Sequence, residues 1–459
     1  MTKSTGNLQT VTKTIVIDDD PTGSQTVHSC LLLMQWDTQT LIEGLRDAAP
    51  LFFILSNTRG MDAAQAADIT REICVNLRTA MAALREQGVS INPVVVSRSD
   101  STLRGHYPVE TDVIAEVLGP FDAHFLVPAF FEGGRFTRDA VHYLMNDGEA
   151  VRVDQTEFAN DSVFGFTTSF LPDYVEEKTA GRIAAGDVVR FGLDDVRGDI
   201  VERLRGLEGN ACCVVDAERQ SDLDRFAGQV LAVAAGGRRF LFRSAASLLT
   251  AFAGLPAQPV PAAQMSRLVR NRRPGVVLVG SHVDKSSRQL RHLTDSCSVT
   301  PLHVDLDSLL RDEEGLFSNL TRQIEEEHAS GRDVVLFTSR GERTFASTAE
   351  RLAFGERVSA FLMRLVRHLP PQLGFLISKG GITSNDTLSK GLALRTARVV
   401  GQIRAGCSVV VCPEDHPRYP GLPVVIFPGN VGGDEALAEV YRILSDHGGA
   451  LASAGTAAA

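Results

Sequence analysis

The chain has 459 residues, of which 44% are hydrophobic and 22% are charged, and 56 Asp and Glu against 46 Lys and Arg give a formal net charge of −10. This length exceeds what one hydrophobic core usually serves and predicts two or three domains, while the near-average composition excludes a disordered or fibrous chain. The acidic balance and the lack of a Lys/Arg-rich block argue against nucleic acid as a partner, although a small anion could still bind where cationic groups gather.

The sequence contains neither a membrane segment nor a secretory signal that we can recognise. Its longest apolar runs, such as Val94–Val96 and Val276–Val279, are far shorter than a membrane span, and Met1–Thr14 is polar throughout. Seven scattered Cys do not form a disulfide framework and favour a reducing compartment. We therefore expect a cytoplasmic protein without membrane contact.

Short apolar runs alternate with helical patterns along the first half of the chain. The runs at Thr14–Ile17, Leu51–Leu55, Val94–Val96 and His124–Pro128 have the length of strands, and Asp62–Gln87 carries its apolar residues on one helical stripe. Such alternation is typical of parallel strands joined by crossover helices, which predicts an α/β sheet.

The middle of the chain is less regular. Residues Asp147–Val201 predict loops and short elements around the first sheet, and the alternation resumes with Ala211–Asp216, Asp222–Ala234 and Arg239–Phe242. The segment Gly254–Ala263 has three Pro, one Gly and no charge, which predicts a stiff linker.

A second α/β series follows the linker. Strands are expected at Val276–Val279, Val334–Thr338, Gly374–Ile377, Val409–Cys412 and Val424–Phe427. Helices are expected at Ser286–Thr294, Leu316–His328, Ala346–His368 and Asp434–Leu444. The prediction is an α/β fold of two domains, residues 1–253 and 274–459 joined by a linker at 254–273, whose mainly parallel sheets face each other across a cleft.

An acidic cluster follows the first predicted strand directly. Asp18, Asp19 and Asp20 stand at its carboxyl end, the edge at which open α/β sheets bind their ligands. Adjacent carboxylates repel one another unless a cation or a hydroxyl-rich ligand meets them. These residues could bind substrate hydroxyls or act as a general base, and the alternative is an Asp-rich turn closed by Pro and Gly.

Two further polar loops follow strands in the same way. The loop after Val94–Val96 is dense in charged and hydroxyl residues, namely Arg98, Asp100, Ser101, Arg104 and His106. Arginine can hold a carboxylate through two parallel hydrogen bonds, so this loop could bind an acid whose hydroxyls face the aspartates; a capped helix start is the alternative. Arg59 lies in a similar loop after Leu51–Leu55, where an ordinary surface turn is the alternative.

Glycine turns follow three strands of the second half, at Gly280-Ser281, Gly380–Ser384 and Gly429–Gly433. Glycine lets the backbone approach a phosphate closely, and helix N-termini present free N–H groups to anions. The three turns together favour a nucleotide site, although each alone is ordinary in α/β folds.

Several familiar motifs are missing. The sequence lacks the GxGxxG dinucleotide fingerprint, a Walker A motif and the GxSxG motif of α/β-hydrolases. Cys407, Cys412 and His416 are close in sequence but have no CxxC pair to support a structural metal site, so we expect no metal held by side chains alone.

In their order, these motifs resemble the four-carbon acid sugar kinase family, which includes threonate and oxo-tetronate kinases. Asp19–Gly23 is similar to the family's Asp-Asp-x-Thr-Gly motif, and Asp100–Thr102 to its Asp-Ser-Thr loop. The three glycine turns of the second half are similar to its Gly-Ser, Gly-Gly-x-Thr-Ser and Gly-Asn-x-Gly loops. The resemblance extends over roughly Lys13–Leu444.

The resemblance implies a kinase that phosphorylates a hydroxyl of a small sugar acid with ATP and Mg²⁺, and it also allows a homodimer. The N-terminal domain would hold the acid, with Asp19 or Asp20 as the base and Arg98 and Arg104 on the carboxylate. The remaining acid-binding residues would be Asp18, Arg59, Asp100, Ser101 and His106. The ATP-binding residues would be Ser281, Gly380, Gly381, Ile382, Thr383 and Gly429.

One departure from the family pattern keeps other functions open. The family often has Lys two residues before the Gly-Asn pair, where this chain has Phe427, and Pro428 then removes a backbone donor. The alternatives are a non-catalytic sugar-acid-binding protein, which this departure favours, and an oxidoreductase or isomerase of the same acids, which the missing dinucleotide fingerprint disfavours.

Overall fold

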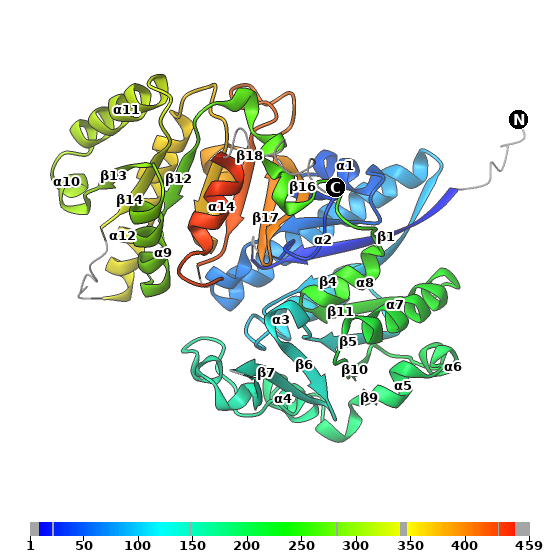
Figure 1. Cartoon of the computed structure of the whole chain (residues 1–459). Coiled ribbons are helices and arrows are strands. Elements are labelled where there is room, and N and C mark those ends of the chain that lie inside the picture. Colours follow the sequence, from blue (N-terminus) through cyan, green and yellow to red (C-terminus); the bar gives the residue numbers. More distant parts are fainter. Residues whose placement is uncertain are drawn as a thin grey trace, which may run out of the picture. The chain divides into compact units, whose positions relative to one another are not determined.

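The computed structural model of the chain describes residues 9–20, 23–146, 148–280, 283–339, 347–429 and 431–445 (Figure 1). It divides into two compact units, Met1–Ala257 and Gln258–Ala459. Each unit has its own mainly parallel sheet with covering helices, which confirms the predicted fold class of two α/β domains.

The first unit is built on a sheet in the order β2-β3-β1-β4-β11-β5-β10-β9, in which every pair is parallel. Its strands are β1 (Gln9–Asp18), β2 (Leu31–Leu33), β3 (Leu51–Leu55), β4 (Val89–Arg98), β5 (Ala123–Val127), β9 (Val189–Phe191), β10 (Ala211–Val215) and β11 (Phe240–Ser244). The strand order reverses between β1 and β4. Ligand sites of open α/β sheets lie at such a point, outside the carboxyl ends of the strands.

The first unit also contains α-helices. They are α1 (Thr38–Arg46), α2 (Ala63–Glu86), α3 (Val109–Leu118), α4 (Leu171–Lys178), α5 (Leu193–Arg197), α6 (Val201–Arg205), α7 (Gln220–Ala235) and α8 (Ala246–Ala253). In α2, a capping box of Asp62 and Gln65 starts the helix, and Ile73 and Leu77 pack in a core shared with Ile15 of β1.

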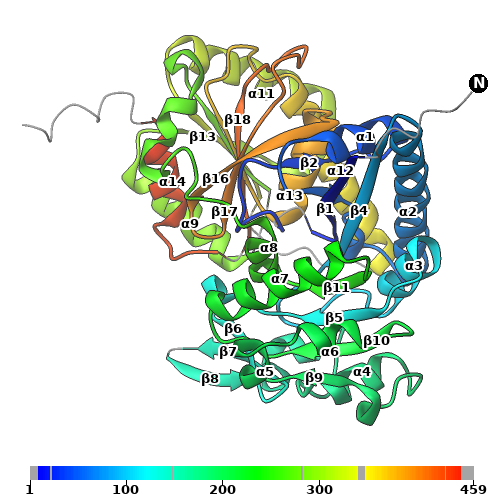
Figure 2. The ribbon, with the colours of Figure 1, turned by 90° about the vertical axis from the view of Figure 1, so that its right-hand side faces the viewer.

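A small antiparallel sheet follows β5. Its strands are β6 (Arg135–Arg138), β7 (Val141–Asn146) and β8 (Glu149–Arg152), and a bridge from Thr137 to Ala217 joins it to the end of β10. Figure 2 shows it beside that end of the main sheet. The segment Asp147–Val201, for which we expected loops and short elements, contains β8, α4, β9 and α5 besides loops, and β9 pairs with β10 in the main sheet.

The sheet of the second unit has the order β13-β14-β12-β15-β18-β17-β16. Its strands are β12 (Val276–Val279), β13 (Thr300–Val304), β14 (Val334–Thr338), β15 (Leu376–Lys379), β16 (Thr396–Arg404), β17 (Cys407–Val411) and β18 (Pro423–Phe427). The strands from β13 to β18 in this order are parallel, and β17 and β16 are antiparallel additions. The chain reverses direction across the sheet between β12 and β15, which makes this pair the switch point.

Helices cover the second sheet as well. They are α9 (Asp284–Ser296), α10 (Leu306–Arg311), α11 (Glu313–Ala329), α12 (Thr348–Arg367), α13 (Gly381–Asp386) and α14 (Ala436–Ser445). Figure 1 shows α9 and α14 side by side, and both contribute to one core with the strands. Met265, from a helical turn at Ala262–Leu268 within the expected linker, is buried in the same core.

None of the helices in the described part of the chain combines the length and the apolar composition that a bilayer span requires. All seven cysteines belong to the described residues and are thiols, six of them buried. Their burial is what an apolar side chain would show, so they act as core residues.

Candidate functional site

The carboxyl ends of β1, β3 and β4 bring the acidic cluster and the two arginine loops of the first unit together. Arg59, on the turn after β3, binds Asp19 through two nitrogens on one edge of its guanidinium, with Nε 3.1 Å from Oδ2 and a terminal nitrogen 2.5 Å from Oδ1. The other terminal nitrogen donates to Asp20 at 2.9 Å. Asp19 is 2% exposed, whereas the side chain of Asp20 is 22% exposed. Asp20 is thus the carboxylate of this pair that a ligand could reach.

Asp18 is the most deeply enclosed member of the cluster. Arg98, at the end of β4, lies 3.5 Å from its Oδ1, and the other oxygen, Oδ2, has no hydrogen-bond partner. Burial raises the pKa of Asp18 to about 7, and Asp19 and Asp20 push it in the same direction, while Arg98 opposes the shift. Burial also raises the pKa of Asp19, against the attraction of Arg59. Asp18 can therefore hold a proton near neutral pH.

Position 23, which closely follows these aspartates, has room only for glycine. A Cβ at this position would lie 1.7 Å from Asp18 Oδ2, so no side chain fits. Pro21 and Thr22, which precede it in the motif, lie outside the described residues. The backbone here closes directly over the carboxylate, which accounts for the enclosure of Asp18.

The loop after β4 forms a second charged group beside the first. Arg104 Nε donates to Asp100 at 2.9 Å, and its guanidinium lies 3.6 Å from Asp161 and 4.9 Å from the ring centre of Phe158. Although burial opposes the shift, Arg59 and Arg104 hold the pKa of Asp100 well below its usual range. Because Arg59 lies 3.9 Å from Asp100 as well, the two groups form one continuous network.

Two other predicted residues hold the loops in place. His106 Nε2 donates to the carbonyls of Thr58 (3.2 Å) and Met61 (3.0 Å) and so ties the β4 loop to the β3 loop. The carbonyl of Ser101 accepts from His142 Nε2 at 2.8 Å. Burial lowers the pKa of His142 to about 4, which keeps this imidazole neutral. His106 and Ser101 thus lie at the site, where their observed bonds position the backbone.

Sequence reasoning missed Arg243 and Glu110. Arg243, in β11, is 5% exposed, and it donates to Ser97 Oγ at 2.7 Å and to Glu110 Oε2 at 2.5 Å. One of its terminal nitrogens has no hydrogen-bond partner, and neither has Nε of Arg98. A cation at the end of a buried strand was the available signal, but we predicted that strand to end at Phe242. These unpartnered donors suit an anionic group of a ligand.

A small, partly open space lies next to Arg243. Its volume is about 20 Å³, and it is lined by Asp100, Arg104, Tyr107, Tyr174 and Arg243 among others. A space of about 10–15 Å³ is the least that admits one water molecule. The space therefore fits only a small polar group in the present conformation.

In the second unit, the glycine turns meet at the switch point. A Cβ on Gly280, after β12, would lie 2.3 Å from Thr383 Oγ1 in α13, so glycine permits this close approach. Gly380 has a φ of 120°, which only glycine adopts readily, and its N–H donates to the carbonyl of Phe427 at 2.8 Å. Ser384 Oγ donates to the carbonyl of Ser378 at 2.9 Å. The turns after β12, β15 and β18 are thus tied to one another.

Of the predicted nucleotide residues, Gly380, Gly381, Ile382, Thr383 and Gly429 lie at this edge, and Ser281 is outside the described residues, as is Asn430. Ile382 is 74% exposed, which is unusual for a large apolar side chain and leaves it available to a ligand. Lys379, which was not among the residues predicted from the sequence, is the last residue of β15 and is fully buried beneath the glycine turns.

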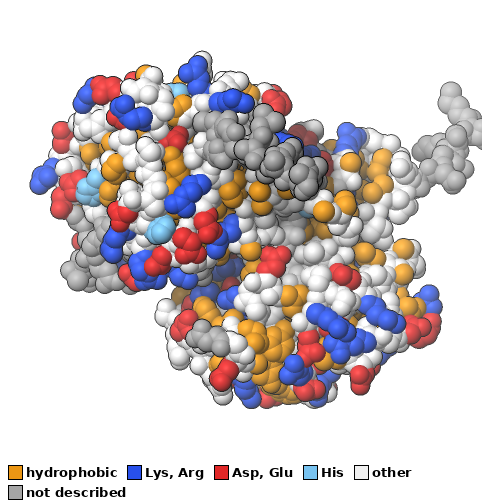
Figure 3. All heavy atoms as spheres, in the orientation of Figure 1, with side chains coloured by type: hydrophobic (Ala, Val, Ile, Leu, Met, Phe, Trp, Pro, Cys, Tyr) orange, Lys and Arg blue, Asp and Glu red, His pale blue; other side chains and the backbone are white. Residues whose placement is uncertain are grey.

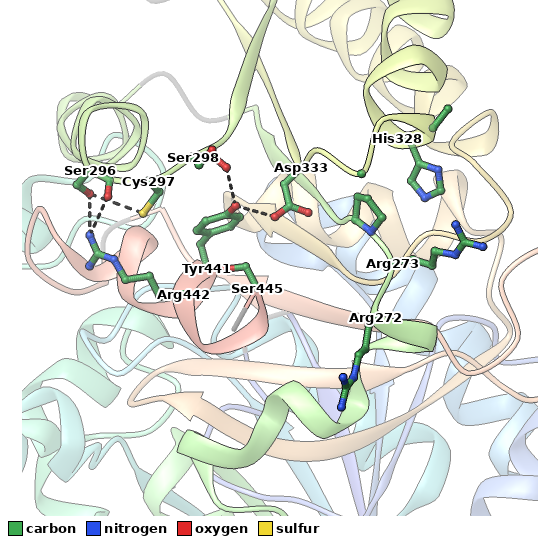
Figure 4. Close-up of a pocket in the computed structure, with 13 residues that line it drawn as sticks. Arg272, Arg273, Ser296, Cys297, Ser298, His328, Asp333, Tyr441, Arg442 and Ser445 are labelled. Carbon is green, nitrogen blue, oxygen red and sulfur yellow. Dashed lines mark hydrogen bonds between the residues drawn. The ribbon is translucent and has the colours of Figure 1, made fainter. Parts of the chain in front are cut away.

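A cavity of about 560 Å³ lies elsewhere in the second unit. It opens at the amino ends of β12, β13 and β14, where Tyr441 donates to Asp333 at 2.6 Å and to the carbonyl of Ser298 at 3.0 Å (Figure 4). Arg442 turns to Ser296 on one side, and Arg272 points away. Its cations do not converge, so we place the candidate site at the carboxyl edge despite the larger cavity here.

Charge is evenly mixed on the face that Figure 3 shows, where Lys and Arg alternate with Asp and Glu over the surface. No broad basic field is visible on that face. Within the described residues, no group of three or more His, Cys, Asp and Glu is arranged to hold a metal ion.

Comparison with known proteins identifies the two halves. Residues 14–252 match the family model described as a sugar-binding N-terminal domain, and residues 276–437 match the one described as a nucleotide-binding C-terminal domain. The curated proteins gave no significant match.

Solved structures share the fold over nearly the whole chain. A Haemophilus influenzae protein described as DUF1537 is 16% identical, with 94% of this chain and 100% of that chain covered and a TM-score of 0.64. A Salmonella typhimurium LT2 protein, provisionally named a tRNA synthase, is 18% identical, with 94% and 98% covered and a TM-score of 0.68. At these identities the likeness supports the fold.

Proposed function

Because the chain belongs to the four-carbon acid sugar kinase family, we propose that it transfers the γ-phosphoryl group of ATP to a hydroxyl of a small sugar acid such as a threonate, erythronate or oxo-tetronate. The observation that supports this best is the charged network at the carboxyl edge of the first unit. It places a reachable carboxylate, Asp20, among buried arginines with unpartnered N–H groups. A polyol acid offers a hydroxyl to Asp20 and a carboxylate to the arginine N–H groups.

The first unit would bind and orient the acid. The unpartnered donors of Arg98 and Arg243 suit the carboxylate, with Arg104 beside them, and Asp20 would accept the proton of the attacking hydroxyl. Asp19, which Arg59 binds through two nitrogens, would keep Arg59 and hence Asp20 in place. Asp18 and Asp100 complete the charge balance of the same network.

The second unit would hold ATP on the turns of Gly280, Gly380–Thr383 and Gly429. Phosphoryl transfer depends on positioning and on neutralising charge more than on covalent help from the protein. Orienting two substrates can contribute roughly 7–11 kcal/mol, and a general base about 10²–10⁴-fold in rate. Mg²⁺ would neutralise phosphate charge and keep most of its ligands as phosphate oxygens and water.

A coupled ADP-release assay over a panel of four-carbon sugar acids tests the proposal. We expect ADP release that requires one of the acids, and we expect Asp20→Asn to lower kcat by about 10²–10⁴-fold with ATP affinity nearly unchanged. Asp68→Asn, at an exposed position of α2, is the matched control and should keep full activity. No ADP with any acid, together with no ATP binding by calorimetry, would reject the kinase proposal.

The second candidate is a non-catalytic protein that binds sugar acids, and the Phe427-Pro428 sequence at the nucleotide edge favours it. It predicts that an acid raises the melting temperature while ATP with Mg²⁺ does not. A cytoplasmic location and a homodimer remain predictions, which fractionation and light scattering would test.

A further inference from the structure

Lys379 is buried without an acidic partner. It is 0% exposed at the end of β15, and its Nζ donates to the carbonyl of Pro428 at 2.6 Å and to that of Gly429 at 3.0 Å. No carboxylate of the described residues forms an ion pair with it. Because lysine is rarely fully buried unless it is paired, its position needs a reason beyond packing.

The lysine lies directly across from Phe427. The two residues are register partners in β15 and β18, and Nζ is 4.4 Å from the centre of the Phe427 ring. An amine therefore lies under the loop after β18 although Phe occupies the position where a lysine was expected from the family pattern.

Three groups turn the carbonyls of this loop inward. Besides the two bonds from Lys379, Ser286 Oγ of α9 donates to the Gly429 carbonyl at 3.2 Å, and the Gly380 N–H donates to the Phe427 carbonyl. In a trans peptide the N–H points opposite to the carbonyl before it. The N–H of Gly429 is consequently aimed away from Lys379, and backbone N–H groups are the donors that bind phosphates in glycine loops.

The titratable groups around Lys379 come from three other elements. Lys285 of α9 disfavours its charge, while Cys407 of β17 favours it, and Arg404 of β16 lies near Cys407. Burial is the largest influence and lowers the pKa of Lys379 to about 7. A nearby anion would raise this pKa again and draw a proton onto the amine.

We propose that Lys379 positions the loop after β18 for the phosphates of a bound nucleotide, by holding two carbonyls inward and by supplying positive charge beneath the loop. This inference rests on the proposed function of the second unit. Lys379 is buried and acts through Gly429, so it is a positioning residue and need not touch the nucleotide.

The chain offers a matched control in Lys13. This lysine is 3% exposed, and its Nζ also donates to two backbone carbonyls, those of Asp47 and Ala49, each at 2.5 Å. It lies in β1 of the first unit, several residues before the acidic cluster. Lys13→Met and Lys379→Met thus remove the same kind of interaction, but only the second lies at the nucleotide loops.

Calorimetry of the full chain with ADP and Mg²⁺ tests the inference, in two buffers of different ionisation enthalpy at pH 7. We expect Lys379→Met to weaken ADP binding at least tenfold and to abolish a proton uptake of about half a proton that the wild type shows. Lys379→Arg should keep more of the affinity but show no uptake. Lys13→Met should lower the melting temperature yet leave ADP affinity and proton uptake unchanged.

The outcomes separate the two proposals. Wild type that binds ADP, with Lys379→Met equal to it in affinity and uptake, would overturn the inference alone. Wild type that binds neither ADP nor ATP would remove the proposed function and this inference with it. If Lys379→Met does not fold, the wild type still decides: its ADP affinity should fall as pH rises from 7 to 9, and a flat profile would overturn the inference.

Discussion

Ionisation of Asp18 destabilises the folded protein. Its buried carboxylate has one unpartnered oxygen and two acidic neighbours, and its pKa is raised to about 7. In the unfolded chain an aspartate titrates near its ordinary pKa of about 4, so between these values the folded protein holds the extra proton. Stability from this group therefore falls as pH rises from about 4 to 7.

The stability of the Asp18→Asn variant relative to the wild type should therefore increase as pH rises. The amide resembles the protonated carboxyl, so the difference in unfolding free energy, variant minus wild type, should become more positive by roughly 2 kcal/mol between pH 5 and pH 8. Urea unfolding at several pH values measures this difference. Asp68→Asn, on the exposed face of α2, should show a difference that does not change with pH. A constant difference for Asp18→Asn would show that the carboxyl is ionised throughout.

At the scale of single residues, the sequence predicts which loops carry the functional side chains but not which side chains contact one another. Asp19 and Arg59 were both candidates because each follows a strand, and the structure pairs them. Arg243 and Lys379 were missed because both fall at the ends of strands whose limits we set too early. Their roles depend on cross-strand neighbours, Ser97 and Phe427, that lie far away in sequence.

Elements were predictable where a turn and a buried apolar run define them. The predicted helix Asp62–Gln87 corresponds to α2 at Ala63–Glu86, because its capping box and its apolar stripe are both local signals. In contrast, β16 was missed because only alternate residues of Thr396–Arg404 are fully buried, and the others include two arginines. Such a strand gives a weaker apolar run than the central, fully buried ones.

Helix α3 shows how an element can support the site. Its first turn places Glu110 between two strand ends, where it accepts from Thr58 Oγ1 and from Arg243, each at 2.5 Å. Glu110 is 3% exposed, and Arg243 is also buried. Removing one partner of a buried ion pair leaves the other charge uncompensated, which costs about 3–5 kcal/mol.

Glu110→Gln should thus lower the unfolding free energy by roughly 3 kcal/mol and weaken acid binding, since Arg243 loses its anchor. Glu116 of the same helix provides the control. It pairs with Arg71 at 2.7 Å, but its side chain is 64% exposed, so Glu116→Gln should leave the unfolding free energy nearly unchanged. Chemical denaturation of both variants compares them, and equal losses would contradict the role of the buried pair.

At the scale of the whole molecule, each unit has one reversal of strand order and places its distinctive loops there. Acidic and arginine loops follow β1, β3 and β4 in the first unit, and glycine turns follow β12, β15 and β18 in the second. The alternation of elements predicted two such sheets, whereas the strand order that brings these loops together depends on long-range pairing. The sequence alone therefore indicated the candidate loops without the topology that joins them.

If this division is functional, each ligand should protect its own unit in hydrogen exchange of the full chain. We expect ADP with Mg²⁺ to slow exchange in the β15–α13 segment, residues 376–386, and in residues 424–429. A sugar acid that supports turnover should slow exchange in residues 97–106. At a ligand concentration 100 times Kd, stabilisation of about 2.7 kcal/mol slows the amides that must open with the site by about 100-fold.

The control for this experiment is the amino edge of the second sheet, around Asp333 and Tyr441, where the larger cavity lies. Its amides should respond less to ADP than those of the glycine turns do. Stronger protection there than at residues 376–386 would move the nucleotide to that cavity and contradict the proposed site. A ligand stabilises the segments that it contacts. If ADP alone protected residues 97–106 and left residues 376–386 unchanged, the assignment of the two ligands to the two units would therefore be reversed.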